Sequence, residues 1–249
     1  MKRKSSYAAI IIMLLLFGTG VLAYYFYFQP KKELAAAEEM MLEQLSATYG
    51  KQFEVSEIEY GKALGDREGT YTSMVYPAGD KHLTFQVHVA ENGKIIDESF
   101  KETKWRSEAI QSWKPFMGKF GHVSYAINIS IPEDVAKQYN LEDTYNQIYQ
   151  KHKHVMSEYI FIAEIEKSFD KEKERGKVAD LLDHTKQREL KDFSIEWLYY
   201  EEGKQDPDVF KMKEEIPAYS WRTSKEQLPE NKAEKNLDQF FMDHKAPGK

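Results

Sequence analysis

The sequence predicts an α+β protein: an N-terminal transmembrane helix, followed by an ectodomain of helices and antiparallel sheet organised as two modules. Three observations lead to this fold class. Residues 7–28 form an uncharged apolar run. Residues 83–89 alternate apolar and polar side chains, which is the period of a strand with one buried face. Residues 31–49 instead place apolar side chains three and four positions apart, the period of an amphipathic helix.

The run Tyr7–Phe28 contains no charged residue, Pro, Asn or Gln. A helix rises about 1.5 Å per residue, so roughly 20 such residues cross a hydrocarbon core of about 30 Å. Lys2, Arg3 and Lys4 precede the run, which favours a short cytoplasmic tip at residues 1–6 and an extracytoplasmic C-terminal domain. The predicted location is therefore the cell membrane, crossed once, with the lipid bilayer as a partner.

A cleaved signal peptide is the alternative interpretation of this run. Val21-Leu22-Ala23 places small side chains at the two positions that a signal peptidase reads. The apolar run, however, continues to Phe28 and is longer than the 7–15 residues that are typical of a signal core. Both interpretations place the remainder of the chain outside the cytoplasmic membrane.

Composition limits the classes of protein that this chain can belong to. Hydrophobic residues at 41% and aromatic residues at 14% are sufficient for a packed core. The formal net charge is −6, although three positive charges lie at the N-terminal tip, and an acidic ectodomain argues against nucleic acid as a partner. The chain has no cysteine, which excludes disulfides, thiolate nucleophiles and Cys-ligated zinc. An exported protein without disulfides is expected in a bacterium that has no oxidising periplasm, so the sequence indicates a Gram-positive bacterium as the source.

The first module, residues 31–118, is predicted to be one helix followed by an antiparallel meander. The helix at 31–49 stops at Gly50, a residue that ends helices readily. Asn92-Gly93 is the pattern of a type I′ hairpin turn between the last two strands. A short helix at 105–119 closes the module. The expected strands are 53–60, 70–76, 83–89 and 94–100.

A resemblance adds to this interpretation of the first module. The pattern Leu45-x-x-x-Tyr49-Gly50-x-x-Phe53-x-Val55, following a membrane segment, resembles small membrane-anchored helix-plus-sheet domains of Gram-positive bacteria whose function is unknown. The resemblance implies a location and a helix-plus-sheet unit. It implies no activity.

The second module, residues 119–249, is predicted to mix strands and helices and to end in a C-terminal helix. Pro132-Glu133-Asp134 is typical of a helix start, and this helix is expected to break near Asn140. The expected elements are a strand at 123–131, a helix at 132–151, a strand at 159–166, a helix at 169–186, strands at 193–199 and 209–216, and a helix at 231–244.

Four aromatic residues of the second module form the predicted binding site: Tyr199, Tyr200, Tyr219 and Trp221. They offer more aromatic surface than one face of a sheet is expected to hide. Aromatic residues are enriched where proteins bind partners. An envelope protein or a glycan is the predicted partner, and packing in the core is the alternative explanation.

Two short patterns suggest chemistry, but each has a plainer explanation. His152-Lys153-His154, with Glu158, could supply metal ligands, although these histidines lie at a predicted helix end that favours basic residues. Ser168-x-x-Lys171 matches part of the penicillin-binding enzyme motif, but its companion motifs are missing and Ser168 fits a helix cap.

Three carboxylates are the remaining catalytic candidates. Glu164 and Glu166 share a strand face, and Glu196 lies on a neighbouring strand, so a cleft between them would suggest a hydrolase. Acidic residues on the solvated face of an antiparallel sheet produce the same pattern. We therefore predict no catalytic residue, no metal site and no cofactor.

The function predicted from these observations is non-catalytic binding or regulation at the cell envelope by a single-pass, membrane-anchored, extracytoplasmic protein. Two alternatives remain open. One is an envelope hydrolase whose catalytic residues are dispersed along the chain. The other is a structural subunit of a membrane assembly, held there by its anchor helix.

Overall fold

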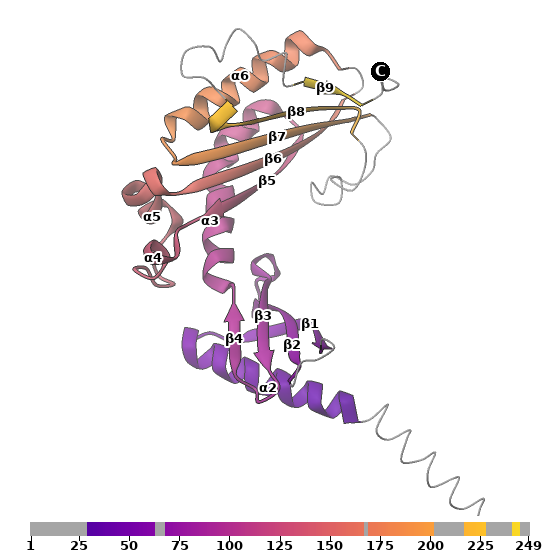
Figure 1. Ribbon diagram of the computed structural model, residues 1–249, viewed down its shortest axis with the longest axis vertical. Helices are drawn as coiled ribbons and strands as arrows, with labels where there is room; N and C mark the ends of the chain where they lie inside the picture. The colour runs from indigo at the N-terminus through magenta and orange to yellow at the C-terminus, as the bar shows by residue number, and fades with distance from the viewer. Residues whose placement is uncertain (1–28, 63–67, 167–168, 202–216, 228–240, 245–249) are drawn as a thin grey trace, which may run out of the picture. The chain divides into compact units, whose positions relative to one another are not determined.

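The computed structural model describes residues 29–62, 68–166, 169–201, 217–227 and 241–244. Helices and two β-sheets make up this part of the chain, which confirms the α+β class (Figure 1). The chain divides into two compact units, residues 1–103 and 104–249, called here unit 1 and unit 2. The predicted anchor, Tyr7–Phe28, lies outside the described residues. Within them, no helix is both long enough and apolar enough to cross a membrane.

Unit 1 contains one long helix and a four-stranded antiparallel sheet. The strands follow one another in the order β1-β2-β3-β4, as the sequence predicts. Leu83, which is predicted to begin the third strand, instead ends a short 3-10 helix, η2 (Lys81–Leu83). The main elements are α2 (Gln29–Tyr49), β1 (Phe53–Gly61), β2 (Thr70–Pro77), β3 (Phe85–Ala90) and β4 (Ile95–Glu98).

The helix α2 packs on this sheet through the apolar stripe that its sequence predicts. Ala37, Met41 and Leu45 are buried, one helical turn apart. Gly50 follows the helix with a φ of 64°, and its N–H donates to the carbonyl of Ser46 at 2.8 Å. A left-handed φ is easily adopted by glycine, so α2 ends where the sequence predicts.

The turn between β3 and β4 differs from the predicted type I′ turn. Gly93 has a φ of 82°, but Asn92 does not share this left-handed conformation. The Gly93 N–H donates to the carbonyl of Ala90 at 2.8 Å, and the Ala90 N–H donates to the carbonyl of Lys94 at 2.9 Å. The loop therefore has three residues and closes on a left-handed glycine. The Asn92 side chain accepts a hydrogen bond from the Lys94 N–H at 3.0 Å, which stabilises this alternative.

Unit 2 contains a five-stranded sheet in the order β5-β6-β7-β8-β9. The pair β6 and β7 is parallel, and the other pairs are antiparallel. The predicted antiparallel sheet is therefore confirmed only in part here, because α6 carries the chain back across the sheet between β6 and β7. The elements are α3 (Phe100–Met117), η3 (Gly118–Phe120), β5 (Val123–Ser130), α4 (Glu133–Ala136), α5 (Tyr145–His152), η4 (Lys153–Val155), β6 (Ser157–Glu166), α6 (Lys171–Gln187), β7 (Asp192–Glu201), β8 (Tyr219–Ser224), η5 (Lys225–Gln227) and β9 (Phe241–Asp243).

The division between the two units falls within α3, between Thr103 and Lys104. The sequence places the module boundary later, after residue 118. The difference arises because Trp105, Ala109 and Trp113 are buried in the core of unit 2. Because these side chains pack in that core, most of α3 belongs to unit 2.

The elements near the C-terminus differ most from the prediction. The break near Asn140 is confirmed, since α4 and α5 are separate helices. Residues 241–243 form the strand β9 instead of the end of a helix, because Phe241 pairs with Trp221 of β8 and packs against the core. The predicted strand at 209–216 and the rest of the predicted helix, residues 231–240, lie outside the described residues.

Apolar side chains pack on both faces of the sheet in unit 2. One face meets α3, α5 and α6, and holds the larger part of the core. The opposite face carries a second cluster formed by Ala126, Ala163, Leu198 and Tyr200, with Phe161 packed against them. The alternation along each strand therefore separates two apolar surfaces, rather than one apolar and one solvated surface.

Candidate functional site

A carboxylate lies at the centre of unit 2. Glu158 is on β6 with 0% of its surface exposed, on the same strand face as Ile160 and Ile162. Moving a charged carboxylate from water into such surroundings is costly unless it is paired and hydrogen-bonded. The structure supplies these partners from two helices, α3 and α5, and from the residue that follows α6.

Both oxygens of Glu158 are fully engaged. Arg188, which follows α6, donates from Nε to Oε2 at 3.0 Å and from Nη2 to Oε1 at 2.5 Å. Trp113 of α3 donates from Nε1 to Oε2 at 3.0 Å, and the Tyr145 hydroxyl of α5 donates to Oε1. Each carboxylate oxygen thus accepts two hydrogen bonds. We call Glu158, Arg188, Trp113, Tyr145 and Tyr149 the Glu158 cluster.

Aromatic rings complete the surroundings of the guanidinium group. The Arg188 Cζ lies 4.9 Å from the ring centroid of Trp113 and 4.5 Å from that of Tyr149. Burial disfavours the charged guanidinium, but Glu158 outweighs this effect and raises the pKa of Arg188. Burial together with Glu158 also raises the pKa of the Tyr145 hydroxyl far above its ordinary value. Arg188 is therefore charged and Tyr145 is neutral at physiological pH.

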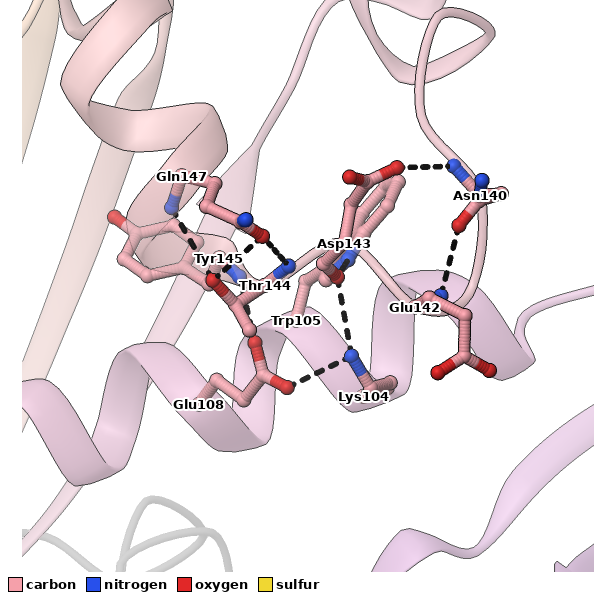
Figure 2. A network of polar contacts seen from close by, with 9 residues as sticks. All are labelled: Lys104, Trp105, Glu108, Asn140, Glu142, Asp143, Thr144, Tyr145 and Gln147. Atoms are coloured by element: carbon pink, nitrogen blue, oxygen red, sulfur yellow. Dashed lines mark hydrogen bonds and ion pairs between the residues drawn. The ribbon is translucent and has the colours of Figure 1, made fainter.

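A network of polar contacts on the outside of α3 fixes the position of Tyr145 (Figure 2). The Tyr145 N–H donates to Glu108 Oε2 at 2.6 Å, and Glu108 pairs with Lys104 at 2.9 Å. Thr144 and Gln147 form a capping box at the start of α5. Tyr145 is the first residue of α5. Glu108 holds its backbone N–H, and Glu158 holds its hydroxyl.

The loop before α5 joins the same network through the carbonyl of Asp143. That oxygen accepts from Lys104 Nζ at 3.1 Å and from Trp105 Nε1 at 2.9 Å (Figure 2). Within the loop, the Asn140 N–H donates to Asp143 Oδ2 at 2.8 Å, and the Glu142 N–H donates to Asn140 Oδ1 at 2.9 Å. The loop is thus closed on itself and docked on α3.

A second buried charge cluster lies at the other end of the same strand face. Lys177 of α6 contacts Glu164 at 2.5 Å and Glu174 at 2.9 Å, and its Nζ is 5.9 Å from the ring centroid of Trp197. Burial disfavours the charged amine, but the two carboxylates outweigh it and raise the pKa of Lys177. We call Lys177, Glu164 and Glu174 the Lys177 cluster.

The chemistry open to these two clusters is limited by their own contacts. The lone pairs of Glu158 are used by protein donors, so this carboxylate has little capacity left to accept a proton from a substrate. Lys177 is held in its charged form, in which an amine is not a nucleophile. Both arrangements are those of buried ion pairs that support a fold.

The four predicted binding residues lie in different surroundings. Tyr199 and Trp221 are buried in the main core, and Tyr200 is buried in the cluster on the opposite face. Tyr219 stays partly exposed and stacks on Phe169, with 4.1 Å between ring centroids. The sheet buries the first three because both of its faces, and not one face alone, pack apolar groups. A binding role for these residues stays a prediction.

Glu164 and Glu196, two of the three carboxylates considered as catalytic candidates, do not line a common cleft. Glu164 lies on the face that packs against α6, whereas Glu196 lies on the opposite face and pairs with Arg222. The plainer explanation, solvated acidic residues on an antiparallel sheet, is also wrong for Glu164, which is buried. The side chain of Glu166 lies outside the described residues.

The predicted histidine and serine candidates are also accounted for. The His152 ring is hydrogen-bonded to the Tyr139 hydroxyl at 2.8 Å, and His154 is exposed. Ser168 lies outside the described residues, and Asp170 caps α6 by accepting from the Glu172 N–H at 3.0 Å. The part of the chain that the structure describes holds no group of three His, Cys, Asp or Glu side chains able to bind a metal ion.

Local patterns in the sequence predict no role for Arg188, and they indicate Glu158 only as a possible metal ligand. A signal for Glu158 is present in the sequence, because this acid continues the apolar alternation of Ile160 and Ile162. A buried acid is either paired and hydrogen-bonded or loses its charge. The identity of the partner is not contained in the local pattern, since Arg188 comes after a helix.

Comparison with protein-family models and with curated proteins gives no match. Among solved structures, the chain is similar to a DUF5037 family protein from Ruminococcus gnavus ATCC 29149, with 14% sequence identity and a TM-score of 0.46. The match covers 70% of this chain and 76% of that chain. This likeness assigns neither a family nor a function, and it gives no link to membrane-anchored domains of Gram-positive bacteria.

Proposed function

We propose that this chain is a single-pass, membrane-anchored, extracytoplasmic protein that binds or regulates a partner at the cell envelope without catalysing a reaction. The observation that supports the non-catalytic part most directly is the Glu158 cluster. Among the described residues of unit 2, the most deeply buried acid is saturated by protein hydrogen bonds, an arrangement suited to rigidity rather than to turnover.

The proposed location rests on the sequence. The uncharged run Tyr7–Phe28 follows three basic residues and is long enough to cross a bilayer. The helix α2 (Gln29–Tyr49) occupies the described residues that follow this run. Anchoring would confine both units to the membrane plane, which increases the rate of encounter with other envelope components.

The location is tested with a reporter enzyme that is active only outside the cytoplasm. Fused after Lys249 of the full chain, the reporter should be active in whole cells. The matched control lacks residues 1–28 and should give no activity. Reporter activity that requires cell lysis would contradict the proposed location, whatever the role of the domain.

The binding role is tested by crosslinking the full-length protein in its membrane. Tyr219 is the predicted binding residue that stays partly exposed, so Tyr219→Ala should reduce recovery of the crosslinked partner. Tyr60→Ala, in unit 1, is the matched control because that tyrosine is 46% exposed. Equal recovery with both variants would show that Tyr219 is structural.

The non-catalytic part of the proposal has its own test. Purified full-length protein should give no turnover of wall glycans, peptides or phosphodiesters. Turnover that is abolished by Lys177→Met in a protein that remains folded would favour the envelope hydrolase instead.

A further inference from the structure

His184 occupies a distinctive place in the core of unit 2. It lies in the last turn of α6, and its ring stacks on Phe116 of α3 with 3.9 Å between centroids and an interplanar angle of 7°. Trp113 of the same helix meets the imidazole edge to face at 4.9 Å. The imidazole is thus one of the groups that join α6 to α3.

Two cations share the aromatic pair on which His184 packs. Lys119, from η3, places its Nζ 5.0 Å from the ring centroid of Phe116. Arg188 places its guanidinium 4.9 Å from the ring centroid of Trp113. From the sheet, Glu158 of β6 could offset this positive charge, but both of its oxygens are engaged by Arg188, Trp113 and Tyr145.

Groups on α6 itself favour the protonated form of His184. Asp180 and Asp183 lie within one helical turn of His184, but both are exposed and therefore screened by solvent. The C-terminal end of a helix favours a positive charge, and so does an aromatic face. Burial, and then Arg188 and Lys119, outweigh these contributions and lower the pKa of His184.

We propose that His184 makes the packing of α6 on α3 sensitive to acid, so that protonation of this one ring loosens the contact beside the Glu158 cluster. At neutral pH the uncharged imidazole stacks as an aromatic group. In acid it becomes a third cation next to Arg188 and Lys119, in a half-buried position where each charge is poorly hydrated. This inference concerns unit 2 itself and does not depend on the proposed location.

The direction of the pH effect follows from linkage. An unfolded histidine has a pKa of about 6.5, and the folded value for His184 lies below it. The unfolded state therefore binds more protons in this range, so stability falls as pH falls. The contribution of His184 is fully present above about pH 6.5 and is lost as the pH drops through the lowered pKa of the folded state.

The test uses the full-length chain in detergent. The imidazole signals of selectively labelled histidines are followed by NMR between pH 8 and pH 4.5, and His184→Gln assigns the His184 resonance. The midpoint for His184 should lie below about pH 6.5, the value of a histidine in an unfolded chain. A midpoint at or above that value would overturn the proposal.

Thermal unfolding supplies the second measurement. The Tm of the wild-type chain should fall between pH 7.5 and pH 5. In His184→Phe, which keeps an aromatic ring but cannot be protonated, this fall should be smaller, whereas in His154→Gln it should be unchanged. The same fall in His184→Phe as in wild type would overturn the proposal. If His184→Phe does not fold, the NMR midpoint decides.

Discussion

Two glutamates on one face of β6 can be compared directly, because the strand presents them to the same core. Glu158 and Glu164 are both buried, and Ile160 and Ile162 lie between them on that face. The two acids have the same side chain, the same strand and helical neighbours on the same side of the sheet. What differs is the cation that neutralises each of them.

Glu158 meets the planar fork of Arg188, which donates to both carboxylate oxygens at once. Glu164 meets Lys177, a point charge that it shares with Glu174. Among the described residues, Oε2 of Glu174 has no hydrogen-bond partner. The comparison teaches that one guanidinium donates to both oxygens of a single buried acid, whereas the Lys177 amine divides its contacts between two acids.

The largest expected effect comes from removing the guanidinium. Arg188→Met leaves Glu158 buried without a charged partner, so we expect the free energy of unfolding to fall by about 3–5 kcal/mol. Urea unfolding followed by circular dichroism measures this. Arg175→Met is the matched control, because Arg175 pairs with the exposed Glu172. A loss below about 1 kcal/mol would contradict a structural role for the buried pair.

Removing the shared lysine should have a smaller effect. Lys177→Met leaves Glu164 and Glu174 without the cation between them, and we expect a loss of about 2–3 kcal/mol in the same assay. The nearby Lys173→Met, at a more exposed position, should change stability by less than about 0.5 kcal/mol. If Lys177→Met costs more than Arg188→Met, the contrast between the two clusters is wrong.

A milder change isolates one hydrogen bond of the Glu158 cluster. Tyr145→Phe removes the hydroxyl that donates to Glu158 while keeping the ring, so we expect a loss of about 1–2 kcal/mol. Tyr159→Phe, at an exposed position on the same strand as Glu158, should be neutral and serves as the control. A neutral Tyr145→Phe would mean that Arg188 and Trp113 alone satisfy the carboxylate.

The smallest expected effect concerns the helix that carries Tyr145. Thr144→Ala removes the capping side chain of α5 and should cost about 1 kcal/mol. Thr48→Ala is the contrasting control, because Thr48 lies within α2, where alanine is the better helix former. Equal destabilisation by both substitutions would show that the capping box does not contribute.

The fold of unit 1 could be predicted from local patterns because its contacts are local. Each strand pairs with the next along the chain, so the alternation at Phe85, Val87 and Val89 and the stop at Gly50 carry most of the information. The turn at Gly93 was assigned the wrong type. Asn-Gly supports more than one hairpin loop, and the side-chain bond from Asn92 to the Lys94 backbone decides between them.

Unit 2 was predicted less completely because its topology depends on distant segments. The alternation along β6 and β7 indicates two strands, but it does not say that α6 makes them parallel. The strands β8 and β9 have mixed composition and gain their structure by pairing with β7 and with each other. Pairing with neighbouring strands determines these elements. The local alternation of apolar and polar residues does not reveal that pairing.

The candidate site shows the same limit. An acid in the buried alternation of β6 is visible in the sequence, whereas its pairing with Arg188, beyond a strand and a helix, is not. The burial of the predicted binding residues shows a related limit. The number of aromatic residues indicates how much aromatic surface the fold must bury. It does not indicate that apolar groups cover both faces of the sheet, where Tyr199 and Tyr200 pack on opposite sides.

The parallel pairing of β6 with β7 has a consequence for the order in which the chain folds. Every strand of unit 1 can pair as soon as the next strand is made, whereas Ser157 must wait for Asp192, across the whole of α6. Closing long loops slows folding, and unit 1 is also the first to be synthesised. We therefore expect the sheet of unit 1 to form first. The strand β6 can pair with β5 at once, but its other edge stays unpaired until β7 is made, and aggregation competes with folding at that edge.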